Sequence, residues 1–100
     1  MGVNMKMIQQ MQTRLEKMQR ELAETEIEGS AGGGMVKARV TGAREFRGIS
    51  IDPSAVDPED VDVLEDLITV AIQDAMNRAN AMADEKMGAL TGGMRIPGLM

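Results

Sequence analysis

Alternating apolar and polar positions mark two strands near the middle of the chain. Val36, Ala38 and Val40 alternate with polar residues, which gives one strand an apolar face and a basic face. A second run, Phe46–Ile51, returns after a short connector that contains Gly42. Because a glycine in a connector of this length suits a hairpin, the pattern predicts two antiparallel strands here.

The second of these strands leaves two interpretations open. Ile49 and Ile51 share one face, whereas Phe46 has the opposite parity. Either Gly48 marks a β-bulge or the second face of the sheet is also covered. The strand is expected to end before Pro53, because proline cannot donate to a β-ladder.

A helical pattern precedes the hairpin. Apolar residues recur every three or four positions and form a narrow stripe, which is typical of a helix that touches one partner surface. The stripe consists of Met5, Ile8, Met11, Leu15, Met18 and Leu22. After it, Thr25 and Ile27 alternate with glutamates, which predicts a short strand that continues almost directly from the helix.

A glycine-rich segment, Gly29–Gly34, connects this short strand to the hairpin. Phosphate-binding glycine loops open a helix, whereas this segment opens a strand. We therefore interpret the whole segment as a flexible hairpin connector without a nucleotide.

A second and longer helix is predicted after the hairpin. Asp57 suits the N-cap, Pro58 suits the first helical position, and the acidic residues that follow favour the positive end of the helix dipole. The apolar periodicity continues to Met87, and Gly88 is expected to end the helix.

The length of this helix indicates a homodimer. It would extend roughly 45 Å, whereas a compact domain of this size has a radius of gyration of about 13 Å. The helix must therefore project beyond its own sheet, and a three-stranded sheet also leaves its edges open. A second copy would cover both. The expected interface residues are apolar: Val36, Val40, Phe46, Ile49, Leu64 and Ile68.

Composition narrows the class of protein. The 100 residues suit one domain and include eleven Met, one Phe and no Trp, Tyr, Cys or His. The absence of Cys excludes disulfides and thiolate zinc sites, and the absence of His excludes the commonest general base. The carboxylate pair Glu65 and Asp66 lies on a strongly acidic helix, where solvated carboxylates are ordinary. We expect no enzyme activity, no cofactor, no metal and no small-molecule substrate.

Charge is unevenly distributed along the chain, although the net charge is −5. Residues 1–20 and residues 35–51 each carry four basic side chains and one carboxylate, whereas residues 57–87 carry nine carboxylates and two basic side chains. The basic side chains of both segments could contact phosphate. Alternatively, the basic side chains of the hairpin could only keep one face of the sheet exposed to solvent or form ion pairs with the acidic helix. The basic residues are Lys6, Arg14, Lys17, Arg20, Lys37, Arg39, Arg44 and Arg47.

The order of these pieces resembles the YbaB/EbfC family of bacterial nucleoid-associated proteins. The resemblance rests on GGGMVKARVTG at residues 32–42, ISIDP at 49–53, LEDLI at 64–68 and GGMRIPGL at 92–99, and it covers nearly the whole chain. The chain departs from the family in small ways, since Gln73 stands where asparagine is expected and the N-terminal segment is short.

This resemblance implies an α+β fold of order α-β-β-β-α, with a three-stranded antiparallel sheet, two long helices and an intertwined, tweezer-shaped homodimer. The dimerising domain is expected over residues 1–90 and a flexible C-terminal tail over residues 91–100. The resemblance also implies DNA binding in the cytoplasmic nucleoid, with roles in nucleoid organisation, gene regulation and DNA protection.

Two interpretations of function remain open from the residues alone. Because the chain has a single aromatic residue, no Trp or Tyr for stacking, and no helix-turn-helix or zinc-finger pattern, DNA binding would mean phosphate contacts with a duplex rather than tight base readout. The alternative is a protein-interaction adaptor that uses its methionine-rich helical arms and does not touch DNA, which the net acidity favours. No apolar run approaches the roughly 18 residues of a membrane span, so no membrane partner is expected.

Overall fold

The computed structural model describes residues 5–90, and within them the chain follows the predicted α-β-β-β-α order. The elements are α1 (Met5–Glu24), β1 (Glu26–Ala31), β2 (Val36–Thr41), β3 (Phe46–Ile51), the short 3-10 helix η1 (Pro53–Ala55) and α2 (Val61–Leu90). The predicted α+β fold of the single chain is therefore confirmed, whereas the homodimer stays a prediction. The tail predicted at residues 91–100 lies outside the described residues, and the domain boundary stays a prediction.

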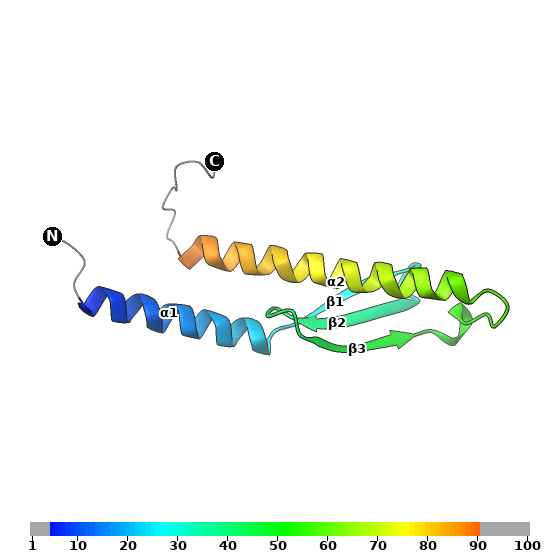
Figure 1. Ribbon diagram of the computed structural model, residues 1–100, viewed down its shortest axis with the longest axis horizontal. Coiled ribbons are helices and arrows are strands. Elements are labelled where there is room, and N and C mark those ends of the chain that lie inside the picture. The colour runs from blue at the N-terminus through cyan, green and yellow to red at the C-terminus, as the bar shows by residue number, and fades with distance from the viewer. Residues whose placement is uncertain (1–4, 91–100) are drawn as a thin grey trace.

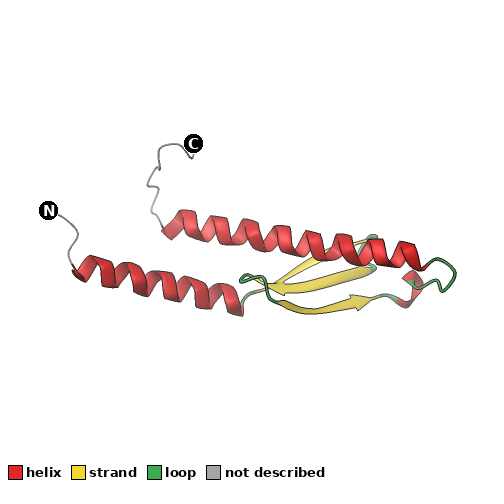
Figure 2. Ribbon diagram, viewed as in Figure 1, coloured by secondary structure: helices red, strands yellow, loops and turns green. Residues whose placement is uncertain are grey.

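The molecule is built in two layers along one axis. Helix α1 and the sheet lie end to end, and α2 runs over both of them (Figure 1). The described helices cover only one face of the sheet (Figure 2). The molecule measures 69 × 28 × 16 Å, with a radius of gyration of 18.9 Å. The prediction that the second helix projects beyond its own sheet is confirmed (Figure 1).

The sheet has the antiparallel order β1-β2-β3, so that β2 is its central strand. Val36, Ala38 and Val40 are fully buried and form the centre of the core beneath α2, as their alternation predicts. Lys37 and Arg39 lie on the opposite face, which α2 does not cover. Helix α2 packs on β1 and β2 and leaves β3 at the rim of this core.

A β-bulge in β3 resolves the parity of Phe46. Arg39 pairs with Gly48 but Val40 pairs with Phe46, so Arg47 is the extra residue of β3. The bulge places Phe46 on the same face as Val40, together with the isoleucines of β3. Of the two interpretations left open, the bulge is confirmed.

The prediction that Gly29–Gly34 is entirely a connector is wrong in its first half. Strand β1 continues through Ala31, and the turn begins at Gly32. Gly29 lies inside the strand because α2 passes directly over it. A Cβ added there would overlap the backbone nitrogen of Ala75 and lie 2.5 Å from the Ala71 carbonyl oxygen.

Both predicted ends of the second helix are wrong by a few residues. Residues 57–60 form a turn, because the Asp57 carboxylate accepts from the Glu59 N–H at 3.0 Å and its carbonyl accepts from the Asp60 N–H at 3.0 Å. Helix α2 therefore begins at Val61. Gly88 does not end it, because one glycine costs a helix only about 1 kcal/mol.

Helix α1 joins the rest of the molecule only near its C-terminal end. Met18 and Leu22 are buried, whereas every residue from Met5 to Arg14 is exposed. At the joint Gly42 lies so close that an added Cβ would be 2.8 Å from the Leu22 carbonyl oxygen. The apolar stripe predicted for this helix is thus packed at one end and open along the rest.

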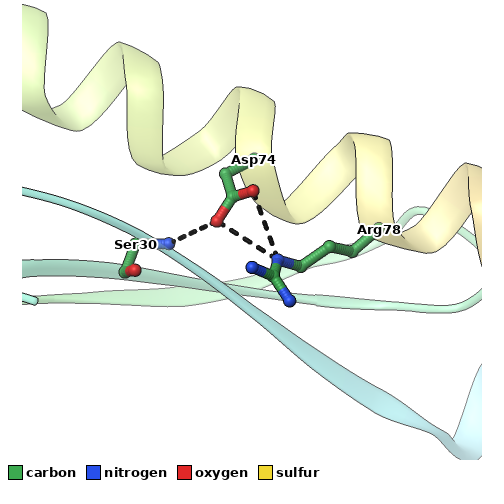
Figure 3. Close-up of polar contacts among 3 residues, drawn as sticks. All are labelled: Ser30, Asp74 and Arg78. Carbon is green, nitrogen blue, oxygen red and sulfur yellow. Dashed lines mark hydrogen bonds and ion pairs between the residues drawn. The ribbon is translucent and has the colours of Figure 1, made fainter.

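Asp74 of α2 anchors the helix to the free edge of β1 (Figure 3). Its carboxylate accepts from the backbone N–H of Ser30 at 3.0 Å and from Nε of Arg78 at 3.2 Å. The Ser30 N–H lowers the pKa of the Asp74 carboxyl, desolvation opposes this, and Arg78 adds to the lowering. The bond also satisfies a donor at an edge that has no neighbouring strand in the sheet.

Gly29→Ala tests the close approach of α2 to the sheet. We expect it to lower the free energy of unfolding by about 3 kcal/mol, the upper end of the usual cost of overpacking. Urea unfolding followed by circular dichroism measures the change. Gly88→Ala is the control, because a Cβ there meets nothing within 4 Å and should stabilise the helix by up to about 1 kcal/mol. Wild-type stability of Gly29→Ala would contradict the packing described above.

Asp74→Asn tests the anchor through its pH dependence. Because the pKa of Asp74 is lowered in the folded state, its charge contributes stability above the unfolded value near 3.8. That stability is lost as the pH falls through the folded pKa. We expect Asp74→Asn to be less stable than wild type at neutral pH and the difference to vanish in acid. Asp84→Asn is the control, because Asp84 is exposed on the same helix and the change should alter stability little.

Candidate nucleic-acid interface

The basic residues predicted on α1 lie on its solvent side. Lys6, Arg14, Lys17 and Arg20 are all exposed. Met18 and Leu22 face α2, and at 100° per residue Lys6, Lys17 and Arg20 fall on the opposite side of the helix, whereas Arg14 lies about 40° of rotation from Met18 and is nearer the side that faces α2. This side of α1, from Lys6 to Arg20, is called the polar face below.

The basic residues predicted on β2 lie on the uncovered face of the sheet. Lys37 is exposed and stands between Ser30 and Ser50 of the neighbouring strands. Arg39 is half-buried, because its guanidinium lies across the sheet and donates to Oγ of Ser50 at 2.8 Å. Its Nε is 4.0 Å from a carboxylate oxygen of Glu26, which is a weak pairing.

Gly48 makes room for this guanidinium. A Cβ added at Gly48 would lie 2.8 Å from a terminal nitrogen of Arg39, and the backbone φ there is +158°. The side chain of Arg39 is thus held flat by a glycine below it and a serine beside it. A guanidinium with restricted rotamers loses less entropy when it binds an anion.

The remaining two predicted residues are placed differently. Arg44 lies in the β2–β3 turn with φ +67°, and its guanidinium donates to Oδ1 of Asn80 on α2 at 3.1 Å. It therefore points toward the helix layer and away from Lys37. Arg47 is exposed at the bulge. Arg44 thus contacts the acidic helix through a neutral amide and not through a carboxylate.

The two layers carry opposite charge. The polar face of α1 and the uncovered face of the sheet both point away from α2, because the apolar sides of both elements pack toward it. Most carboxylates of residues 57–87 lie on α2 or just before it. The two cations of α2 are engaged, Arg78 by Asp74 at 3.2 Å and Lys86 by Glu21 of α1 at 3.7 Å.

Strand β1 limits the basic surface. Its outward residues Glu26 and Glu28 are exposed carboxylates on the same face as Lys37 and Arg39. The positive part of the sheet is therefore confined to β2, β3 and the side next to the bulge. Together with the polar face of α1, it forms the arrangement to which a polyanion could bind.

The predicted interface residues fall into two groups. Val36 and Val40 are fully buried under α2 in the single chain, so their side chains present no surface to a partner. Phe46 is 54% exposed, and Ile49, Leu64 and Ile68 are half-buried at the rim of the core. Only the second group has apolar surface left to cover.

Sequence reasoning missed the residues that hold these groups in place. Ser50, Asn80 and Asp74 make their contacts 11, 36 and 44 positions away along the chain. Spacing therefore carries no signal of them. Thr41, which by alternation falls on the same side of β2 as Lys37 and Arg39, is nevertheless buried, and its hydroxyl accepts from the N–H groups of Ala43 and Glu45, closing the turn.

The described residues 5–90 can also be compared with what a metal site, a membrane span or a carboxylate pair requires. No three acidic side chains gather there in a way that could hold a metal ion. In the same residues, neither helix is both long and apolar enough to cross a membrane. The carboxylates Glu65 and Asp66 are exposed on α2, as expected for solvated side chains.

Comparisons with known proteins identify similar sequences. Residues 1–94 match the family model described as the YbaB/EbfC DNA-binding family. A nucleoid-associated protein of Alkaliphilus metalliredigens is 50% identical over 95 residues, which cover 95% of this chain and 83% of that protein. A nucleoid-associated protein of Chloroflexus aggregans is 50% identical over 91 residues, which cover 91% of each chain.

A solved structure has the same fold. The crystal structure of protein HP0035 from Helicobacter pylori superposes with a TM-score of 0.77, covering 90% of this chain and 99% of that one. The two sequences are 17% identical, so this likeness concerns the fold alone.

Proposed function

The chain belongs to the YbaB/EbfC DNA-binding family, and from this we propose that it binds duplex DNA as a homodimer, largely through phosphate contacts. The observation that supports the proposal is the separation of charge between the layers. Lys6, Lys17 and Arg20 lie on the side of the molecule that carries Lys37 and Arg39, away from the carboxylates of α2. A protein with net charge −5 thereby offers a polyanion a basic surface.

The dimensions of this surface suit a duplex. The 20 residues of α1 extend about 30 Å, which corresponds to roughly nine base pairs at 3.4 Å each. The surface is straight, and the chain has no Trp or Tyr on which unpaired bases could stack. Through such contacts the protein would alter DNA conformation and contribute to nucleoid organisation, gene regulation and DNA protection.

The proposed dimer forms where the single chain leaves its core incomplete. Helix α2 does not cover β3, whose Phe46 is 54% exposed. Strand β3 is also an edge strand, with an open row of backbone groups. A second copy that covers β3 and the half-buried Leu64 and Ile68 would complete this core and double the basic surface.

The open part of α1 supports a second candidate function. Met5 is 68% exposed, Met7 54% and Met11 46%, and flexible methionine surfaces adapt to several protein partners. The protein could therefore act as an adaptor that binds other proteins through these arms. A mobility-shift assay with duplex DNA at low salt separates the two, because an adaptor of this kind would leave the DNA unshifted.

The double change Lys17→Glu, Arg20→Glu tests the DNA surface. We expect weaker binding to all duplexes alike, since phosphate contacts position a protein without reading sequence. The log–log dependence of affinity on salt should flatten by about 0.9 for each phosphate that the variant no longer neutralises. Both side chains are exposed, so stability should change by less than about 1 kcal/mol. Fluorescence anisotropy over a salt series measures the binding.

Arg78→Glu provides the matched control for this pair. Arg78 lies on the acidic helix and is paired with Asp74, so its reversal should weaken DNA binding less. If Arg78→Glu abolished binding while the double variant bound as tightly as wild type, α2 would be the DNA-contacting arm and the proposed surface would be wrong.

Phe46→Glu tests the proposed dimer. We expect it to raise the dimer dissociation constant by about a hundredfold, because it removes a central aromatic contact and introduces a charge. Sedimentation velocity at micromolar concentration measures the change, and circular dichroism should show an intact fold. Val40→Asp should instead unfold the chain, since Val40 is fully buried. A folded wild-type monomer under these conditions would contradict the dimer.

A further inference from the structure

The N-terminal half of α1 has an unusual surface for a helix of an acidic protein. All its residues from Met5 to Arg14 are exposed, so this part of the helix meets solvent on every side. No carboxylate occurs before Glu16. In their place stand neutral side chains that both donate and accept hydrogen bonds: Gln9, Gln10, Gln12 and Thr13.

Most of these neutral groups are on the polar face. Gln9, Gln10 and Thr13 border one shallow depression together with Lys6 and Arg14. Thr13 donates its hydroxyl hydrogen to the Gln9 carbonyl at 2.9 Å, which fixes its rotamer. Gln12 does not border this depression. The depression thus combines two amides with two cations.

This combination differs from what phosphate binding alone requires. Phosphates are recognised mainly by cations, and Lys17 and Arg20 already supply them nearer the sheet. Side-chain amides add little to electrostatic attraction. They do match base edges, because glutamine pairs with the N6 and N7 atoms of adenine, and arginine with O6 and N7 of guanine.

The shape of this segment also suits a groove. An α-helix with its side chains is about 10–12 Å across, and the major groove of B-DNA is about 12 Å wide. A helix can enter only if neighbouring elements do not block it. Helix α1 meets this condition at its N-terminal half, since its packing against the rest of the described chain begins near Leu15.

Building on the proposed function, we propose that the N-terminal half of α1 enters the major groove and that Gln9 and Gln10 read base edges there. Lys17 and Arg20 then bind the flanking phosphates. Gln10 and Arg20 are about 15 Å apart along the helix axis, which lets the same helix reach the groove floor and a bordering backbone. The protein would accordingly prefer certain duplex sequences, with adenine among the bases contacted.

The experiment measures sequence preference separately from affinity. The wild-type protein is used to select from a pool of random duplexes, and the enriched duplex is compared with a shuffled duplex of equal composition by fluorescence anisotropy. We expect at least a tenfold preference, because each bidentate amide–base contact typically gives roughly 5- to 150-fold discrimination. The double change Gln9→Ala, Gln10→Ala should reduce this ratio toward one.

Two further readouts make the result decisive. Because the glutamines are neutral, the double change should leave affinity for the shuffled duplex within about twofold and the salt dependence unchanged. Gln12→Ala is the matched control and should keep the full preference. The inference is overturned if wild type enriches no sequence, or if Gln12→Ala loses the preference as the double change does. Failure to bind any duplex would instead overturn the proposed function together with this inference.

Discussion

The close contact between α2 and β1 is the constraint on which the rest of the structure depends. Gly29 has no side chain, and Ala71, Ala75 and Ala79 are fully buried above the sheet. Small residues on both surfaces let the helix backbone approach the strand directly. Only at this separation can Asp74 reach the backbone of Ser30. A core with no aromatic residue in it is sufficient because the space to be filled is so small.

The same contact organises the electrostatics. Helix α2 and the turn before it carry nine of the 16 carboxylates, and the position of α2 on one face of the sheet keeps that charge away from the other face. Since α2 also continues over Met18 and Leu22, it orients α1 in the same way. One helix therefore turns the polar sides of two other elements to a common direction. Net charge is a poor guide to the partners of a molecule built like this.

Local patterns in the sequence predict the order and type of the helices and strands. The features that they do not predict depend on contacts between residues far apart in the chain. The alternation around Val36 identifies a strand and its buried face without knowledge of any partner. The role of Gly29 depends on Ala75, which follows far later, so a glycine-rich segment looked like a loop throughout. Arg44 looked equivalent to Lys37 from its charge, although a contact with Asn80 turns it to the opposite layer. Whether the polar face of α1 and the uncovered face of the sheet point in the same direction depends on how the elements pack, and no local sequence pattern reports it.

The narrow joint of α1 has a mechanical consequence. The helix is attached near Leu22 and Gly42, and its first residue, Met5, lies about 25 Å away along the axis. A tilt of about 10° at the joint would therefore displace the tip by about 4 Å, close to the rise of one base pair. Small rearrangements at the packed end of this lever would therefore be amplified at its free end.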